Sequence, residues 1–320
     1  MKNKRLELNK FAFPLMVNFI LSYILELSDI AIVARVSTPA FNAVNLISST
    51  LYTISGVLGA TAIIINTKLG EKLGQGDEKG LNYEFFSSLA INIFMGILFL
   101  LLMLLGKTYF LKIFYNLSGE TLEQGILFSY PMSFCVLLQL CLFTFGAYFR
   151  ISNMTKWILI GSTVSSVLNL GLDYLFVLGK FGFPKFGITM VGFSTVFSMF
   201  VNLLIYIFVL KNKLKLKFEL LKSYFINGFN HFKLAFPIMI QEIFDGTIFV
   251  IIFNMIVIRI GNNEFAGYSI ITNLIMFLFT FKHIYGSATL SLISISSGEK
   301  NFRNLIDYPK ISVKITTVLF

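Results

Sequence analysis

Charged residues are scarce in this chain of 320 residues. Asp, Glu, Lys and Arg together make up 13% of it, whereas soluble domains carry about 25%. Hydrophobic residues make up 56%, and the mean hydropathy is +0.79. The shortage of charge excludes an ordinary soluble domain. The chain is therefore predicted to be an integral membrane protein, with the lipid bilayer as its main partner.

Cysteine and histidine are also rare. The two cysteines, Cys135 and Cys141, lie in one apolar run and form no CxxC motif, so they indicate no disulfide framework. The two histidines, His231 and His283, are far apart in the sequence and offer no His-based metal cluster. We therefore expect no metal cofactor and no other bound cofactor.

Signatures of catalysis and of nucleotide hydrolysis are missing from the sequence. It contains no H-E-x-x-H motif and no Walker motif, and we find no Ser–Lys pair of the kind a membrane-embedded enzyme would need. Gly74, Gln75 and Gly76 lie in a loop that no strand precedes, so they form a turn rather than a nucleotide-binding loop. We predict that the chain is not an enzyme and that it does not itself use ATP.

Long apolar runs dominate what is present. A helix needs about 20 residues to cross the hydrocarbon core, whereas strands of a membrane barrel alternate over about ten residues. The runs are therefore predicted to be helices, and the fold is all-α and polytopic. They cover residues 11–34, 46–67, 85–105, 125–149, 157–178, 187–210, 234–258 and 265–294, and a ninth begins near 307.

The net charge of +10 comes from basic residues between these runs. Nucleic-acid binding is not needed to explain it, because loops on the cytoplasmic side of a membrane protein carry an excess of Lys and Arg. Alternate loops hold 18 of these residues on one side and 6 on the other. The side with 18 includes the N-terminus, which is predicted to be cytoplasmic. We expect a multi-pass protein of the bacterial inner (plasma) membrane.

The sequence repeats itself at an offset of 223–224 residues. Because six spans separate the copies, both copies start from the same side of the membrane, as in transporters built from two parallel bundles. We predict an N-terminal six-helix bundle over residues 1–210, a basic cytoplasmic linker over 211–233 and a second bundle from 234. The repeated segments are 8–16 with 230–239, 34–43 with 258–267, and 74–77 with 298–301.

The second bundle is predicted to be incomplete. Residues 234–320 contain the seventh and eighth spans and the start of a ninth, which has about ten apolar residues before Phe320. So short a segment does not cross the hydrocarbon core. We therefore expect a chain that is truncated within its second bundle.

Three carboxylates, Glu26, Asp29 and Asp173, lie within the spans of the first bundle. Asp173 is on the same helical face as Asn169, four residues earlier, and Asp29 lies in the first span. A charged residue at the bilayer centre costs about 2.5–3.5 kcal/mol on insertion scales, and such residues mark ion and substrate pathways. Asp29 and Asp173 are both six residues from the outer end of their spans. They are therefore predicted to lie at one depth and to exchange H⁺ or bind Na⁺.

An alternative interpretation is structural. The carboxylates would then be interior polar groups bonded to Asn18, Asn45 or Asn169. Glu26 shares a face with Asp29 and is a further candidate for binding substrate or ion.

The seventh and eighth spans carry a second polar group. Glu242 and Asp245 lie at nearly the same distance from the cytoplasmic side as Lys282. The positions are consistent with a structural ion pair between neighbouring helices, and equally with binding of an ion or substrate. Both alternatives stay open at this stage.

Several stretches of the sequence resemble the multidrug and toxic compound extrusion (MATE) transporters. The resemblance extends over essentially the whole chain, or about the first nine of the twelve helices of that family. The most specific piece is the N-x-x-L-D-Y-x-F pattern at 169–176. The other matching positions are 13–16, 27–35, 74–77, Gly187, Gly192, Pro237 and 298–301.

The resemblance implies two six-helix bundles around a central cavity and alternating access. It implies export of small organic, often cationic, compounds in antiport with H⁺ or Na⁺, by a protein that we expect to be a monomer. It assigns cation coupling to Asp29 and Asp173, with Asn169 as a polar partner. Asp245 stands where another branch of the family has a glutamate. Two alternatives are a flippase for lipid-linked oligosaccharides, which should have a basic cavity, and a fragment that transports nothing.

Overall fold

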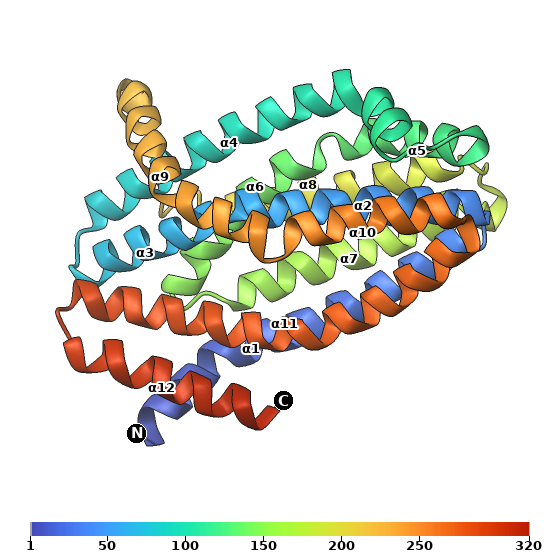
Figure 1. Ribbon diagram of the computed structural model, residues 1–320. Coiled ribbons are helices and arrows are strands. Elements are labelled where there is room, and N and C mark those ends of the chain that lie inside the picture. The colour runs from blue at the N-terminus through green and yellow to red at the C-terminus, as the bar shows by residue number, and fades with distance from the viewer. Residues whose placement is uncertain (1, 320) are drawn as a thin grey trace.

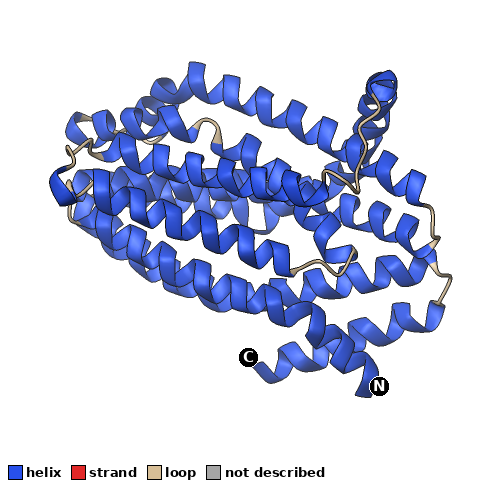
Figure 2. Ribbon diagram, turned by 180° about the vertical axis from the view of Figure 1, so that it is seen from behind, coloured by secondary structure: helices blue, strands red, loops and turns tan. Residues whose placement is uncertain are grey.

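The computed structural model describes the backbone of residues 2–319, and the side chains of these residues except 2–3, 22, 25–29, 276–283 and 318–319. Every regular element in residues 2–319 is helical (Figure 2). The N- and C-terminal ends lie near each other, at the left and below the main bundle in Figure 1. The prediction of an all-α fold is confirmed.

Twelve α-helices and four short helical segments follow one another along the described chain. The first bundle comprises α1 (Lys2–Ala34), α2 (Thr38–Gly59), α3 (Thr61–Gly74), α4 (Glu78–Tyr109), η1 (Phe110–Phe114), α5 (Gly119–Met132), α6 (Cys135–Ile151), α7 (Lys156–Phe176), η2 (Lys180–Gly182) and α8 (Ile188–Leu210). The remainder comprises η3 (Phe218–Leu220), α9 (Leu221–Glu242), η4 (Ile243–Thr247), α10 (Ile248–Ile260), α11 (Asn262–Gly298) and α12 (Phe302–Leu319).

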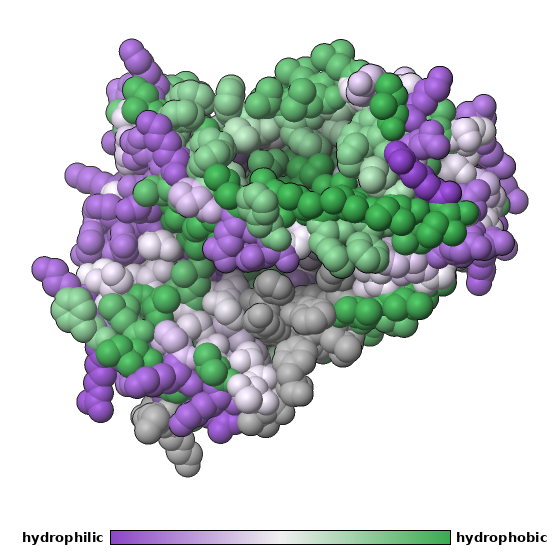
Figure 3. Space-filling model, in the orientation of Figure 1, coloured by the Kyte–Doolittle hydropathy of each residue, from purple (hydrophilic) through white to green (hydrophobic). Residues whose placement is uncertain are grey.

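Among the described residues, five helical stretches are long and apolar enough to cross a membrane, or six if the bent pair α5–α6 is one span. This confirms a polytopic membrane protein. Apolar residues cover much of the middle of one face, and hydrophilic residues gather at its two ends (Figure 3). That distribution matches a hydrocarbon belt between two aqueous surfaces.

Three of the predicted spans contain interruptions. The run at 125–149 is the pair α5–α6, bent by 40°. Pro131 lies just before the bend, and the hydroxyls of Ser129 and Ser133 each donate to the carbonyl four residues earlier, at 2.8 Å. Both features bend helices. The run at 46–67 is divided between α2 and α3, and that at 234–258 contains the π-helical turn η4.

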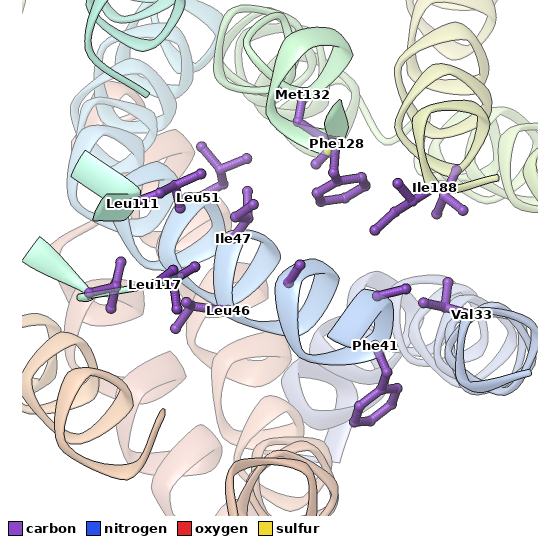
Figure 4. Packing of buried hydrophobic residues seen from close by; sticks show 14 of the residues in the cluster. Val33, Phe41, Leu46, Ile47, Leu51, Leu111, Leu117, Phe128, Met132 and Ile188 are labelled. Atoms are coloured by element: carbon purple, nitrogen blue, oxygen red, sulfur yellow. The ribbon is translucent and has the colours of Figure 1, made fainter. Parts of the chain in front are cut away.

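The core of the first bundle lies where α2 meets α5 and α8. Leu46, Ile47 and Leu51 of α2 belong to one buried cluster with Phe128 of α5. In Figure 4 Leu46 lies near Leu117 and Leu51 near Leu111. Deletion of such buried groups costs both transfer energy and the cavity that remains. This packing holds α2 against α5, which packs in turn on α8.

Residues 211–233, predicted to be a linker, are partly helical. The helix α9 begins at Leu221 and runs without a break to Glu242. It packs closely on α4, and Gly228 permits this approach because a Cβ there would collide with the carbonyl oxygen of Ser87. In Figure 1 α9 is inclined at a large angle to the long helices, and α10 then runs alongside α2.

The α3 and α11 helices pack with almost no space between their backbones. In Figure 1 the end of α11 lies beside α3. A Cβ at Gly70 would meet Ser294, and a Cβ at Gly74 would collide with the carbonyl oxygen of Ile295. Small residues spaced by four allow helices in membranes to approach this closely. Gly70 and Ser294 differ by the repeat offset, as do Gly74 and Gly298. A parallel repeat about a two-fold axis brings such equivalent residues together at the axis.

The loop after α3 is tight and well capped. Gly76 has φ +69°, which favours glycine. Asp77 caps α4 by accepting a hydrogen bond from the backbone N–H of Gly80 at 2.8 Å, and Lys72 lies 3.1 Å away. The Gly80 N–H and then the Lys72 ammonium stabilise the carboxylate and lower the pKa of Asp77. These contacts explain the residue types in the 74–77 stretch.

Candidate functional site

Asp173 lies at the interface of α7 and α8 and is fully buried, with 0% exposure. The hydroxyl of Ser194 on α8 donates a hydrogen bond to its Oδ1. Asp173 belongs to the last turn of α7, and its carbonyl oxygen accepts the N–H of Val177 at 2.9 Å. The structure thus places the carboxylate inside the bundle, as the cost of exposing it to lipid requires.

Polar residues recur at every fourth position of α8, and all are buried: Ser194, Ser198, Asn202 and Tyr206. They therefore form one stripe along one face of the helix. A Cβ at Gly161 of α7 would collide with the side chains of Asn202 and Tyr206, so the stripe faces α7 along its length. A polar ladder, defined as Asp173 and Asn169 of α7 with these four residues of α8, crosses the bundle interior.

The antiparallel register places Asn169 level with Ser198, one turn deeper than the Asp173–Ser194 pair. Asn169 Oδ1 and Ser198 Oγ are buried and have no hydrogen-bond partner among the described residues. An unsatisfied buried polar group costs about 1–3 kcal/mol. Amide, hydroxyl and carboxylate oxygens are the donors that hard cations bind. The ladder therefore has the chemistry to accept a small cation or a proton beside Asp173.

The remaining first-bundle candidates are on α1. The side chains of Glu26 and Asp29 lie outside the described residues, so their common depth with Asp173 stays a prediction. The middle of α1 does contact α7, where the hydroxyl of Ser162 donates to Asn18 Oδ1. The helix α1 thus lies beside the helix that carries Asp173.

Ser194 was not among the partners expected for Asp173. Asn18 accepts from Ser162, and Asn45 donates to the Phe41 carbonyl oxygen at 2.9 Å. The four-residue spacing of polar side chains in α8 was the available signal for the missed partner. Spacing alone does not say which neighbouring helix such a stripe faces, and only the packing shows that it is α7.

The second group of candidates is exposed. Gln241 Nε2 donates to Asp245 Oδ2 at 3.0 Å, and Glu242 is exposed beside them. Asp245 lies in the π-helical turn η4, a type of distortion often found at functional sites. The side chain of Lys282 lies outside the described residues, so the ion pair predicted for it is not tested. The structure does not bring Asp245 or Glu242 to the polar ladder.

A buried ion pair that sequence reasoning missed joins α4 to α9. His231 Nε2 is 2.7 Å from Glu84 Oε2, with side-chain exposures of 3% and 13%. The Ser88 hydroxyl lies 3.0 Å from the other ring nitrogen, Nδ1, and Asn227 donates to Glu84 at 3.0 Å. The pair therefore holds the first helix after the linker against the first bundle.

Removal of His231 should destabilise the protein strongly. We expect His231→Ala to lower the free energy of unfolding by about 1–3 kcal/mol, because the largely buried Glu84 carboxylate then loses its contact with the imidazole. The double variant Glu84→Ala with His231→Ala should recover part of this loss. Thermal unfolding in detergent measures these variants and Glu84→Ala alone. If the loss in the double variant equalled the sum of the losses of Glu84→Ala and His231→Ala alone, the two side chains would not be coupled.

The match to a family of known proteins decides what this fold is. The MatE family model matches residues 14–175 and 237–320. The chain belongs to the MatE family. Both matched segments start at Pro14 and Pro237, the prolines that open the two copies of the repeat.

Individual MatE relatives agree with this assignment. The chain is 26% identical over 273 residues to the probable multidrug resistance protein NorM of Thermotoga maritima, covering 83% of this chain and 57% of that protein. It thus spans less than two thirds of that relative. An outward-facing multidrug resistance MATE family transporter superposes with a TM-score of 0.80 at 16% identity, covering 99% of this chain and 70% of that one. The MatE proteins are transporters, so the expectation that the chain is not an enzyme is confirmed.

An inward-facing MATE family transporter superposes less well. Its TM-score is 0.68 at 17% identity, and the match covers 96% of this chain and 71% of that one. Among the residues whose side chains are described, no three His, Cys, Asp or Glu are grouped so as to hold a metal ion.

Proposed function

We propose that this MatE chain belongs to a secondary active exporter of small organic, often cationic, compounds. Antiport with H⁺ or Na⁺ drives the export. The observation that carries the proposal is the buried Asp173, which lies in a ladder of oxygen donors between α7 and α8. Relatives named as multidrug resistance proteins support the substrate class.

The coupling cation is proposed to bind at Asp173, with Asn169 and Asp29 as further ligands. Asn169 supports this role because its buried Oδ1 has no partner among the described residues. A cation bound between Asp173 and Asn169 would neutralise the carboxylate and would also supply the missing partner of the amide oxygen. Glu26, Glu242, Asp245 and Lys282 are proposed as substrate-contacting or ion-contacting residues.

Alternating access is proposed to use the α3–α11 crossing as one of its two closures. Asn66 of α3 donates to the Ser291 hydroxyl of α11 at 3.1 Å, and both side chains are buried. The crossing lies beside the loops at 75–77 and 299–301, on the side that carries most of the basic residues. With the N-terminus cytoplasmic and the protein a monomer in the inner membrane, this closure seals the cytoplasmic side.

A vesicle assay on the full-length gene product tests the proposal. Everted vesicles take up a fluorescent cationic dye by the same step that exports it from a cell. We expect uptake when the lumen is acidic or rich in Na⁺, and the two gradients applied separately identify the coupling ion. Vesicles without the protein are the control. If dye uptake were the same with and without each gradient, the proposed antiport with H⁺ or Na⁺ would be wrong. If there were no uptake under either gradient, the proposed export would be wrong.

A further inference from the structure

An apolar cavity of about 260 Å³ lies in the wall of the first bundle, away from the polar ladder. The side chains that line it come from α2, α4, η1 and α5, near the end of α4 that is remote from the basic loops. Leu102 lines the cavity and is also exposed on the outside of α4, beside the exposed Leu105. The cavity therefore opens on a surface that faces lipid.

One cation stands at this apolar cavity. Lys107 lines it and has an exposure of only 6%. Its Nζ donates to the Leu104 carbonyl oxygen at 2.8 Å and lies 3.8 Å from the centre of the Tyr130 ring. Lys107 forms no ion pair with any described residue. A buried ammonium group has three donors, and it is costly unless an anion compensates its charge.

Gly106 leaves the cavity open. It lines the cavity, and a Cβ at this position would meet nothing within 4 Å. Glycine inside a helix is unfavourable relative to alanine. Close helix packing does not explain this glycine, because no neighbour approaches it. The free space beside Lys107 does explain it.

We propose that this cavity binds an anionic phospholipid, with an acyl chain against the apolar wall and the phosphate at Lys107. The bilayer supplies a ligand that is apolar along its length and negative at its head. Charge complementarity selects anionic over neutral phospholipid, because only the former leaves a net negative charge for Lys107. The same lysine repels organic cations, so this site is distinct from the proposed export pathway.

Native mass spectrometry tests the headgroup contact. Wild-type protein is reconstituted in vesicles of equal phosphatidylglycerol and phosphatidylcholine, and the lipid that stays bound after extraction is identified. We expect retained phosphatidylglycerol in wild type. Lys107→Gln should reduce the preference for phosphatidylglycerol about tenfold, because the charge-assisted hydrogen bond to the phosphate is lost. The matched control is Lys112→Gln, which removes an exposed lysine from η1, directly after the end of α4.

A second variant tests the acyl chain contact and keeps Lys107 in place. Gly106→Leu fills the cavity and should reduce retention of both lipids. Gly56→Leu is its control, because a Cβ at Gly56 also meets nothing within 4 Å, and Gly56 does not line the cavity. Equal retention of the two lipids by wild type would overturn the proposal. So would a preference for phosphatidylglycerol that Lys107→Gln and Lys112→Gln change equally.

Discussion

Substitution of Asp173 by Asn is expected to abolish cation-coupled efflux in the full-length protein. The amide has nearly the shape of the carboxylate, and its oxygen still accepts the hydrogen bond from Ser194. It cannot take up a proton or compensate the charge of Na⁺ near neutral pH. Dye uptake into everted vesicles should fall to the level of vesicles without the protein, under either an acid or a Na⁺ gradient.

Two further variants separate coupling from folding. Glu123→Gln neutralises an exposed carboxylate on α5 and should leave uptake unchanged. Ser194→Ala keeps the charge of Asp173 but removes a hydrogen bond, so uptake should persist with an altered dependence on pH or Na⁺. The amount and melting temperature of Asp173→Asn in the membrane must match wild type. Unchanged coupled uptake by that variant would disprove the role of Asp173.

The substitution Gly74→Ala is expected to force α3 and α11 apart. The new Cβ collides with the carbonyl oxygen of Ile295, and backbone atoms of Gly298 and Glu299 lie 3.0 Å from it. Backbone atoms cannot turn away as a flexible side chain can. Overpacking of this kind costs about 1–3 kcal/mol. We expect a lower melting temperature, and a loss of uptake because the crossing no longer closes.

The equivalent position in the repeat provides a second test of the crossing. Gly298→Ala should have an effect similar to Gly74→Ala, because its Cβ collides with the carbonyl oxygen of Glu71. Gly56→Ala is the control, since the space around Gly56 is open. It should stabilise the protein by about 0.4–1 kcal/mol, by restricting the unfolded chain. If all three variants melted alike, α3 and α11 would not be in close contact.

The helices were predictable because the signal for them is local. A run of about 20 apolar residues is helical in a membrane whatever surrounds it, since every backbone group must be bonded internally. The bends were less predictable. The α5–α6 bend depends on Pro131 together with the hydroxyls of Ser129 and Ser133, and the turn η4 inserts its distortion without a proline.

The site was predictable only in part. Asp173 and Asn169 stood out because polar groups in hydrocarbon are costly, and the structure places both at the α7–α8 interface. Ser194 and the Glu84–His231 pair were missed, since 21 and 147 residues separate the partners. Contacts at such separations depend on how each helix is rotated and on which helices pack together. The spacing of residues along the sequence shows neither of these.

By itself, the sequence determined the membrane class, the helices, the repeat and the residues too polar to face lipid. The membrane class, the helices and the polar residues follow from the free energy of transfer, which depends on each segment alone. The repeat follows from comparing the two halves of the sequence. Only the tertiary structure decided that Ser194 bonds Asp173, that Gly74 meets the α11 backbone and that Lys107 stands at a cavity. Each of these depends on the register between two helices, and a rotation of either would break it while leaving every local preference unchanged.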